Sequence, residues 1–341
     1  MNIVITGGAG FLGARLARTL LTQGQLSLAG ERARPITRLT LVDRANPSPD
    51  LLADTRVQAI VGDLNDLLRL TPGGTRAVPA GTDVVFHLAA AVSGECEADF
   101  DLGMRSNFAA THALLEACRA LKSRPTVVFA SSLAVFGNPP GQALPAVIED
   151  DTLPTPQSSY GIQKFIGEQM VADYGRKGFV RARNIRLMTV SVRPGRPNGA
   201  ASSFFSGMIR EPLAGVRAQV PVPPHTPVAL SSPRSTIAGI VRAAETADGD
   251  WGALHAMNLP ALRTTVGDMA AALERVAGQA ATDLLDWVED PAILKLVNTW
   301  PGNVQAARAA GLGLHPDTDF ESIVREYVRE NPNAVRLPVQ P

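Results

Sequence analysis

The first half of the chain alternates short runs of β-branched and aliphatic residues with longer segments whose apolar residues recur every three to four positions. The short runs predict strands, and apolar runs such as VVFHLAA suit strands that are covered on both faces. The predicted strands span residues 2–6, 38–42, 57–61, 83–88, 126–130 and 184–189, and the predicted helices span residues 11–22 and 100–122. Strands that alternate with helices predict βαβ units, and therefore an α/β fold with a Rossmann-type, doubly wound parallel sheet.

The pattern changes near residue 190. Residues 191–215 and 220–228 are rich in Pro, Gly and Ser and predict ordered loops more than regular structure. Helical spacing resumes later, and the tail after Asn331 is expected to fray. The later predicted helices span residues 234–247, 266–277 and 319–330. We expect a first domain over 1–190 with a return around 228–258, and a smaller second lobe over 191–330.

Composition limits the classes of partner. The chain has 341 residues, of which 45% are hydrophobic, enough for one large domain or two modest ones. Lys+Arg and Asp+Glu are both 32, so no bulk field favours nucleic acid or an anionic membrane. Neither a signal peptide nor an apolar run of the roughly 20 residues that span a membrane is recognisable. The 2 cysteines are too few for a disulfide framework or a zinc site, so we expect a cytoplasmic protein without a metal.

A glycine-rich turn lies between the first predicted strand and the first predicted helix. In TGGAGFLG the glycines can be read as Gly7-x-x-Gly10-x-x-Gly13 or as Gly8-x-Gly10-x-x-Gly13. Glycines at a strand-to-helix turn let the backbone approach a pyrophosphate, and the start of the helix adds favourable partial charge. The turn predicts a dinucleotide site but leaves the two spacings open.

Two acidic residues follow the next strands. Asp43 can accept hydrogen bonds from a ribose 2′-hydroxyl, which favours NAD over NADP, although the adjacent Arg44 could meet a 2′-phosphate. Asp63 either holds the adenine edge or caps the helix that begins at Leu64. His87, at the end of a strand, is expected to be structural.

The most informative stretch is YGIQK, residues 160–164. On a helix, Tyr160 and Lys164 lie on one face, and an ammonium group there is expected to lower the pKa of the phenol so that it serves as a general base. Ser131 and Ser132 follow a predicted strand, where a side chain faces the crevice at the carboxyl ends of the strands. These residues predict proton-transfer chemistry beside the dinucleotide.

Taken together, TGGAGFLG, FHLAAA, Asn107, SSLAVFG and YGIQK resemble the extended short-chain dehydrogenase/reductase family, which includes sugar-nucleotide epimerases. The resemblance implies that Tyr160 is the acid/base, that Lys164 positions the nicotinamide ribose, and that Ser132 orients the substrate hydroxyl. It favours the Gly7-x-x-Gly10-x-x-Gly13 spacing, with Gly8 as added flexibility. The cofactor, NAD, is expected to contact Gly7, Gly10, Phe11, Leu12, Gly13, Asp43, Asp63, Leu64, Leu88, Ala89, Ala90, Asn107, Tyr160 and Lys164.

Within the family, several segments of the chain bear on the substrate. The chain has IRLMT at 185–189 and LSSPRS at 230–235 where nucleotide-sugar enzymes have LRxxN and an RDF-type motif, which speaks against a nucleotide sugar. Residues 191–215, LSSPR and ADFDLGMRSN instead resemble members that act on a small hydroxy acid. That resemblance implies NAD-dependent oxidation of D-erythronate, a four-carbon 2-hydroxy acid, at C2 to a 2-oxo acid. An epimerase or dehydratase, or a dehydrogenase of another short aldonate, stays open as an alternative.

A carboxylate substrate needs a positive or polar clamp, and an arginine fork suits it. Polar residues in the unusual segments are therefore candidates beside the proton-transfer residues. The predicted substrate-binding set is Ser93, Ser132, Tyr160, Arg193, Ser202 and Arg234. The family often pairs through the helices that correspond to residues 100–122 and 159–176, so we also expect a homodimer.

Overall fold

The computed structural model describes residues 1–71, 74–197, 199–253 and 255–340, and the chain divides into two compact units. The first unit comprises Met1–Ser132, Ser159–Arg186 and Ile237–Met257, and the second comprises Leu133–Ser158, Leu187–Thr236 and Asn258–Pro341. The predicted division at residue 190 differs from this one, because residues 133–158 belong to the second unit. The return to the first unit spans residues 237–257.

A sheet whose described strands number seven forms the centre of the first unit, in the order β12-β8-β7-β6-β1-β4-β5. Its strands are β1 (Asn2–Thr6), β4 (Arg38–Asp43), β5 (Val57–Val61), β6 (Val84–His87), β7 (Thr126–Ser132), β8 (Arg181–Leu187) and β12 (Met257–Asn258). β1 pairs in parallel with both β4 and β6, and the sheet extends on either side through the parallel pairs β4–β5 and β6–β7. The strand order therefore reverses beside β1, which is where such folds bind ligands, and the predicted α/β Rossmann-type sheet is confirmed.

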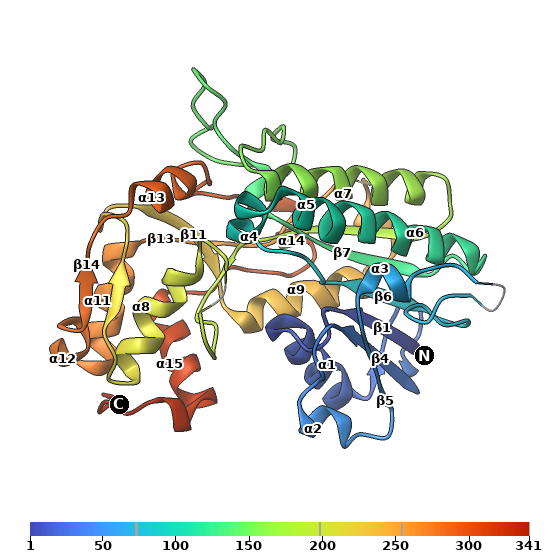
Figure 1. Ribbon diagram of the computed structural model, residues 1–341, viewed down its shortest axis with the longest axis horizontal. Helices are drawn as coiled ribbons and strands as arrows, with labels where there is room; N and C mark the ends of the chain where they lie inside the picture. Colours follow the sequence, from blue (N-terminus) through green and yellow to red (C-terminus); the bar gives the residue numbers. More distant parts are fainter. Residues whose placement is uncertain (72–73, 198, 254, 341) are drawn as a thin grey trace. The chain divides into compact units, whose positions relative to one another are not determined.

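Helices cover the sheet, with α6 and α7 on one side and α1 on the other (Figure 1). The helices of this unit are α1 (Phe11–Gln23), α2 (Pro49–Leu52), α3 (Leu64–Leu67), α4 (Ser93–Ala98), α5 (Phe100–Gly103), α6 (Ala110–Ala120), α7 (Ser159–Arg176) and α10 (Asp248–Trp251); β2 (Gln25–Leu26) and β3 (Arg34–Pro35) form a small hairpin. The single helix predicted over 100–122 is interrupted by a π-helix at Met104–Ala109. Apolar spacing does not distinguish a π turn from an α turn, so the sequence pattern could not reveal it.

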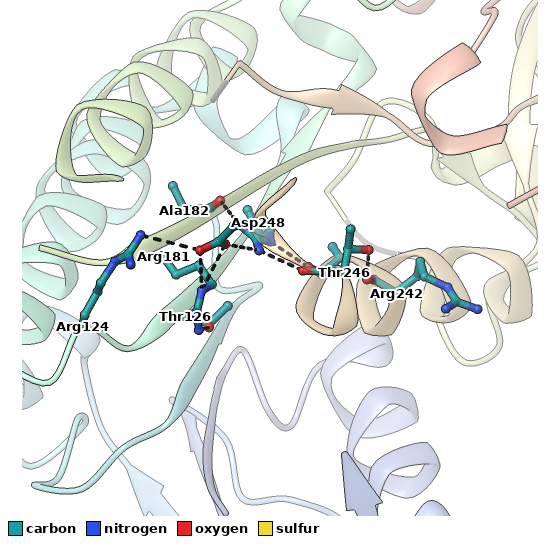
Figure 2. Close-up of polar contacts among 9 residues, drawn as sticks. Arg124, Thr126, Arg181, Ala182, Arg242, Thr246 and Asp248 are labelled. Atoms are coloured by element: carbon teal, nitrogen blue, oxygen red, sulfur yellow. Dashed lines mark hydrogen bonds and ion pairs between the residues drawn. The ribbon is translucent and has the colours of Figure 1, made fainter. Parts of the chain in front are cut away.

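Arg183 on β8 forms hydrogen bonds with the segment 237–257, which returns to the first unit. Its buried guanidinium donates to the carbonyls of Ala243 (3.1 Å) and Thr246 (2.9 Å) and to Asp248 (2.7 Å). Figure 2 shows Asp248 also facing Arg124 and Arg181, which lie 3.8 and 3.1 Å away. One guanidinium group thus bonds two carbonyls and a carboxylate, and these charged hydrogen bonds hold residues 243–248 against β8.

The second unit packs three helices around its own core. Its elements are the 3₁₀ turns Leu133–Val135 and Pro332–Ala334, β9 (Thr189–Val190), α8 (Ser203–Leu213), β10 (Ala218–Val220), β11 (Pro227–Ser231), β13 (Leu262–Thr265), α11 (Val266–Ala277), α12 (Gln279–Thr282), β14 (Leu285–Trp287), α13 (Pro291–Val297), α14 (Ala307–Gly311) and α15 (Phe320–Glu330), and α9 (Pro233–Glu245) begins here and continues into the first unit. Buried Met208, Leu273 and Val324 come from α8, α11 and α15 and belong to one apolar cluster.

Two expectations for this unit were wrong. Residues 191–215 contain a helix, α8, because Phe205, Met208, Ile209 and Leu213 form a buried face at helical spacing despite the Gly, Ser and Pro around them. The described part of the tail, residues 332–340, is held by hydrogen bonds. The amides of Arg336 and Leu337 donate to the carbonyl of Leu213 at 2.8 and 3.2 Å, and the amide of Gln340 donates to that of Val276 at 2.8 Å.

Candidate active site

Ser132, Tyr160 and Lys164 come together in the first unit. Ser132 is the last residue of β7 and Tyr160 is the second residue of α7, and their hydroxyls are joined by a hydrogen bond. Lys164, one turn farther along α7, is buried, and its Nζ donates to the carbonyl of Ala130 at 2.8 Å. Ser132 and Tyr160 are both partly buried. The arrangement places a proton-transfer group and a hydroxyl donor side by side.

The pKa values in this group differ from the expectation. Burial raises the pKa of Tyr160 to about 12, against the hydrogen bond to Ser132, which favours the phenolate. Burial also lowers the pKa of Lys164 to about 8. The predicted lowering of the tyrosine pKa by the ammonium is therefore wrong for this structure. The Lys164 nitrogen lies 5.7 Å from the centre of the Tyr160 ring and is bonded to a carbonyl, so burial dominates.

The glycine turn is built by close approaches of backbone to backbone. Gly7 has φ +72°, and a Cβ there would lie 2.9 Å from the amide nitrogen of Ala89. A Cβ on Gly13 would lie 2.1 Å from the carbonyl oxygen of Gly7, so only glycine lets α1 begin this close to the turn. Gly8 packs closely against β4, because a Cβ there would lie 2.8 Å from the Cβ of Leu41. These contacts explain the Gly7 and Gly13 positions.

The residues present fit the pyrophosphate of a dinucleotide. Helix α1 begins after Gly10 at Phe11 and Leu12, and its first turn carries neither an acidic residue nor a side-chain cap. Its amide groups and dipole are thus left for an anion. Leu88, Ala89 and Ala90, which follow β6, are partly exposed beside this turn.

The acidic residues at the strand ends already have partners. The Asp43 carboxylate accepts the amides of Ala9 (3.0 Å) and Ala45 (3.1 Å), so it braces the glycine turn. Asp63 caps α3: it accepts the amide of Asn65, just after Leu64, at 3.0 Å. Its other oxygen accepts Arg44 at 3.0 Å. Of the two interpretations of Asp63, the structure shows the helix cap, and a contact of Asp43 or Asp63 with a cofactor stays a prediction.

Asn107 lies buried in the π-helix. Its amide oxygen accepts the amide of Ala91 at 2.8 Å, and its amide nitrogen donates to the carbonyl of Ala91 (3.1 Å) and to Oε1 of Gln163 (2.8 Å). The side chain therefore joins the loop after β6 to α7, next to Lys164.

His87 makes contacts of a structural kind: it bonds Thr6 and Thr111. Burial lowers its pKa to about 3, so it is neutral.

The candidates for substrate recognition lie in both units. Ser93 is buried at the start of α4 in the first unit, whereas Arg193, Ser202 and Arg234 belong to the second. Arg234 is ion-paired with the buried Glu326 at 3.0 Å. Ser202 immediately precedes α8 without a side-chain cap.

Arg193 differs from Arg234 in its surroundings. Its guanidinium donates to the carbonyl of Arg196 at 3.2 Å, and within the part of the chain that the structure describes it has no carboxylate partner. Burial and the neighbouring cation of Arg210 lower the pKa of Arg193. A partly buried cation beside a second cation favours an anionic ligand.

The sequence patterns missed Glu168. This residue, four positions after Lys164 on α7, is buried and accepts both Ser131 and Arg186. A glutamate on a helix ordinarily faces water, and only its spacing of four from a buried lysine could have indicated otherwise.

The sequence profile of the NAD dependent epimerase/dehydratase family matches residues 3–225. The chain belongs to this family. NAD is the cofactor that the family uses, which agrees with the prediction. The family includes the extended short-chain dehydrogenases, so the resemblance drawn from the motifs is confirmed.

Similar proteins within the family cover almost the whole chain. A D-erythronate dehydrogenase of Cupriavidus necator is 50% identical over 97% of this chain and 98% of its own length. A D-erythronate dehydrogenase of Haemophilus influenzae is 39% identical over 96% and 99% of the two chains. A crystal structure described as a nucleoside-diphosphate-sugar epimerase of Agrobacterium tumefaciens is 38% identical, covers 98% of this chain and 95% of its own, and superimposes with a TM-score of 0.85.

The described residues also bear on metal binding and on membrane insertion. Among the described residues, no three His, Cys, Asp or Glu side chains gather in a way that could hold a metal ion. None of the described helices is long and apolar enough to cross a bilayer.

Proposed function

We propose that this chain is an NAD-dependent dehydrogenase that oxidises D-erythronate at C2 to 2-oxo-tetronate. The observation that carries the proposal is the 50% identity to a D-erythronate dehydrogenase over nearly the whole of both chains. The hydrogen-bonded Ser132 and Tyr160 with Lys164 beside them support it, because proton transfer from a hydroxyl requires such a group.

The proposed reaction removes a hydride from C2 of the substrate and a proton from the hydroxyl group on that carbon. Tyr160 takes the proton of the C2 hydroxyl, and Ser132 donates a hydrogen bond that holds the same oxygen. NAD supplies the hydride acceptor when it is bound. The carbon–hydrogen bond at C2 breaks, a carbonyl forms, and the products are the 2-oxo acid, NADH and one proton.

In this proposal the cofactor lies along the first unit. The predicted contacts at the glycine turn, at Asp43, after β6 and at the Tyr160–Lys164 pair remain our assignment for NAD. Asn107 positions the loop after β6 and helix α7, since its amide group is bonded to Ala91 and Gln163. Of the two arginines predicted to bind the substrate's carboxylate, Arg193 is favoured over Arg234, whose charge is paired with Glu326.

We also propose a homodimer that pairs through α5 and α7. Phe100 on α5 and Ile162 on α7 are 60% and 46% exposed, and large apolar side chains on neighbouring helices suit a protein interface. A cytoplasmic location stays a prediction.

The test is a substrate panel. Purified protein is incubated with NAD and D-erythronate, L-threonate, other short aldonates or UDP-sugars, and NADH is followed by its absorbance. We expect saturable NADH formation that is fastest with D-erythronate. Conversion of a UDP-sugar without net NADH would instead support a nucleotide-sugar epimerase, the description carried by the similar Agrobacterium tumefaciens structure.

A variant separates chemistry from binding. Tyr160→Phe keeps the ring and removes the hydroxyl, so turnover is expected to fall by about a thousandfold, within the usual range for a general acid–base. The Kd for NAD, measured by calorimetry, is expected to stay within threefold. Retained turnover would mean that another group moves the proton.

A further inference from the structure

Three consecutive residues at the end of β7 are bonded to α7. The contacts are Ala130 with Lys164, Ser131 with Glu168, and Ser132 with Tyr160. The first and third involve the proposed proton-transfer group. The second does not touch it, yet it lies between the other two along the strand.

The Ser131 contact ends in a buried ion pair. The Ser131 hydroxyl donates to Oε1 of Glu168 at 2.5 Å. Nε and Nη2 of Arg186, on β8, donate to Oε1 and Oε2 of the same carboxylate at 2.9 and 2.8 Å. The side chains of Arg186 and Glu168 are 3% and 1% exposed, so the pair is almost fully removed from water. The carboxylate is held from two directions and cannot rotate without losing a charged hydrogen bond.

Burying an ion pair between a helix and a strand costs desolvation free energy, and apolar side chains of the same volume often stabilise a fold equally well. What apolar side chains cannot do is fix a hydroxyl group in one direction. Glu168 does this for Ser131. Ser131 shares its backbone with Ser132, so the same bond limits where the Ser132 hydroxyl can lie.

We propose that Glu168, held by Arg186, is a positioning residue that fixes Ser131 and thereby aligns Ser132 with Tyr160. This inference rests on the proposed function for its kinetic test. It assigns no chemical step to Glu168, which acts only through the end of β7.

Ser131→Ala removes the one hydroxyl and leaves the ion pair intact. We expect kcat for D-erythronate to fall about tenfold, whereas KM and the Kd for NAD stay within twofold. Ser131→Thr keeps the hydroxyl and is expected to recover at least half of kcat. Tyr174→Phe is the matched control, since it also deletes a hydroxyl that bonds a carboxylate, Glu116, but away from the end of β7. Its kcat is expected to stay within twofold of the wild type.

A double variant covers the case in which single changes disturb folding. Glu168→Met combined with Arg186→Met removes both charges at once, so neither is left buried alone. We expect a cooperative unfolding transition near that of the wild type but a kcat as low as that of Ser131→Ala. Near-wild-type kcat in either Ser131→Ala or the double variant would overturn the inference.

A readout without substrate separates this inference from the proposed function. The chain has only 3 tyrosines, so ¹³C labelling at the tyrosine ring carbon that bears the hydroxyl gives few signals to assign. We expect Ser131→Ala to shift the Tyr160 signal in the same direction as Ser132→Ala does. An unshifted signal would contradict the positioning role even if erythronate proved not to be the substrate, whereas a wild-type protein inactive on erythronate would contradict only the function.

Discussion

Replacing Gly13 with alanine tests the close approach that builds the glycine turn. The added Cβ would lie 2.1 Å from the carbonyl oxygen of Gly7, 2.8 Å from its carbonyl carbon and 2.9 Å from the Cα of Gly8. All three atoms are backbone, so no side chain can rotate away. Because ordinary van der Waals contacts are about 3.5 Å, α1 and the turn must separate by about 1.4 Å at the closest contact.

The cost follows from this geometry. Overpacking a well-packed site costs about 1–3 kcal/mol, and a clash with three backbone atoms places Gly13→Ala near the upper value. The alanine recovers about 0.5–1 kcal/mol because it is a better helix former than glycine. The net loss of stability is about 2 kcal/mol. A folding unit of 150–250 residues loses about 2–4 °C in Tm per kcal/mol, so Tm should fall by roughly 4–8 °C.

The assay is thermal unfolding followed by circular dichroism, with NAD affinity measured in parallel. Gly249→Ala is the matched control: it lies in α10, and a Cβ there meets nothing within 4 Å. We expect the control to keep or slightly raise Tm and to keep the Kd for NAD. For Gly13→Ala we expect a lower Tm together with at least tenfold weaker NAD binding. Unchanged values for both would refute the argument from close approach.

Three further predictions concern proton transfer, recognition and assembly. Tyr160 can accept the substrate's proton only after losing its own, and burial raises its pKa to about 12; kcat for erythronate oxidation should therefore keep rising from pH 6.5 to pH 9.5, and a flat or falling profile would contradict this. Arg193→Leu should raise KM for erythronate by about 10–100-fold, as expected for a lost charged hydrogen bond, and Arg234→Leu by less than threefold; the reverse order would reassign the clamp. Phe100→Asp should shift the molar mass in light scattering from dimer to monomer, and an unchanged dimer would place the interface elsewhere.

The sequence pattern predicted the elements that follow simple periodicity. The bounds of β1, β5 and α11 agree with the predicted ranges, since each is a short run rich in β-branched residues or a regular helical face, and each is followed by glycine. The π-helix around Asn107 and the helix α8 could not be predicted in this way. The first has the same apolar spacing as an α-helix, and the second lies among residues whose composition favours loops.

The chemistry of the site was predictable only in part. Spacing along the chain placed Tyr160 and Lys164 on one helical face, and Ser132 proved to be their neighbour. The pKa of Tyr160 was predicted in the wrong direction, because burial depends on how the whole unit packs and not on local spacing. Ala9, which bonds Asp43, and Ser131, which bonds Glu168, lie far from their partners in the sequence, so these contacts required the fold.

The central claim is oxidation at C2 of D-erythronate, and an isotope label tests it directly. D-erythronate carrying deuterium at C2 is incubated with the protein and NAD, and the mass of the NADH formed is measured. The proposed reaction predicts NADH that carries one deuterium. Unlabelled NADH would mean that a different carbon is oxidised, and the absence of NADH would contradict the assignment as an erythronate dehydrogenase.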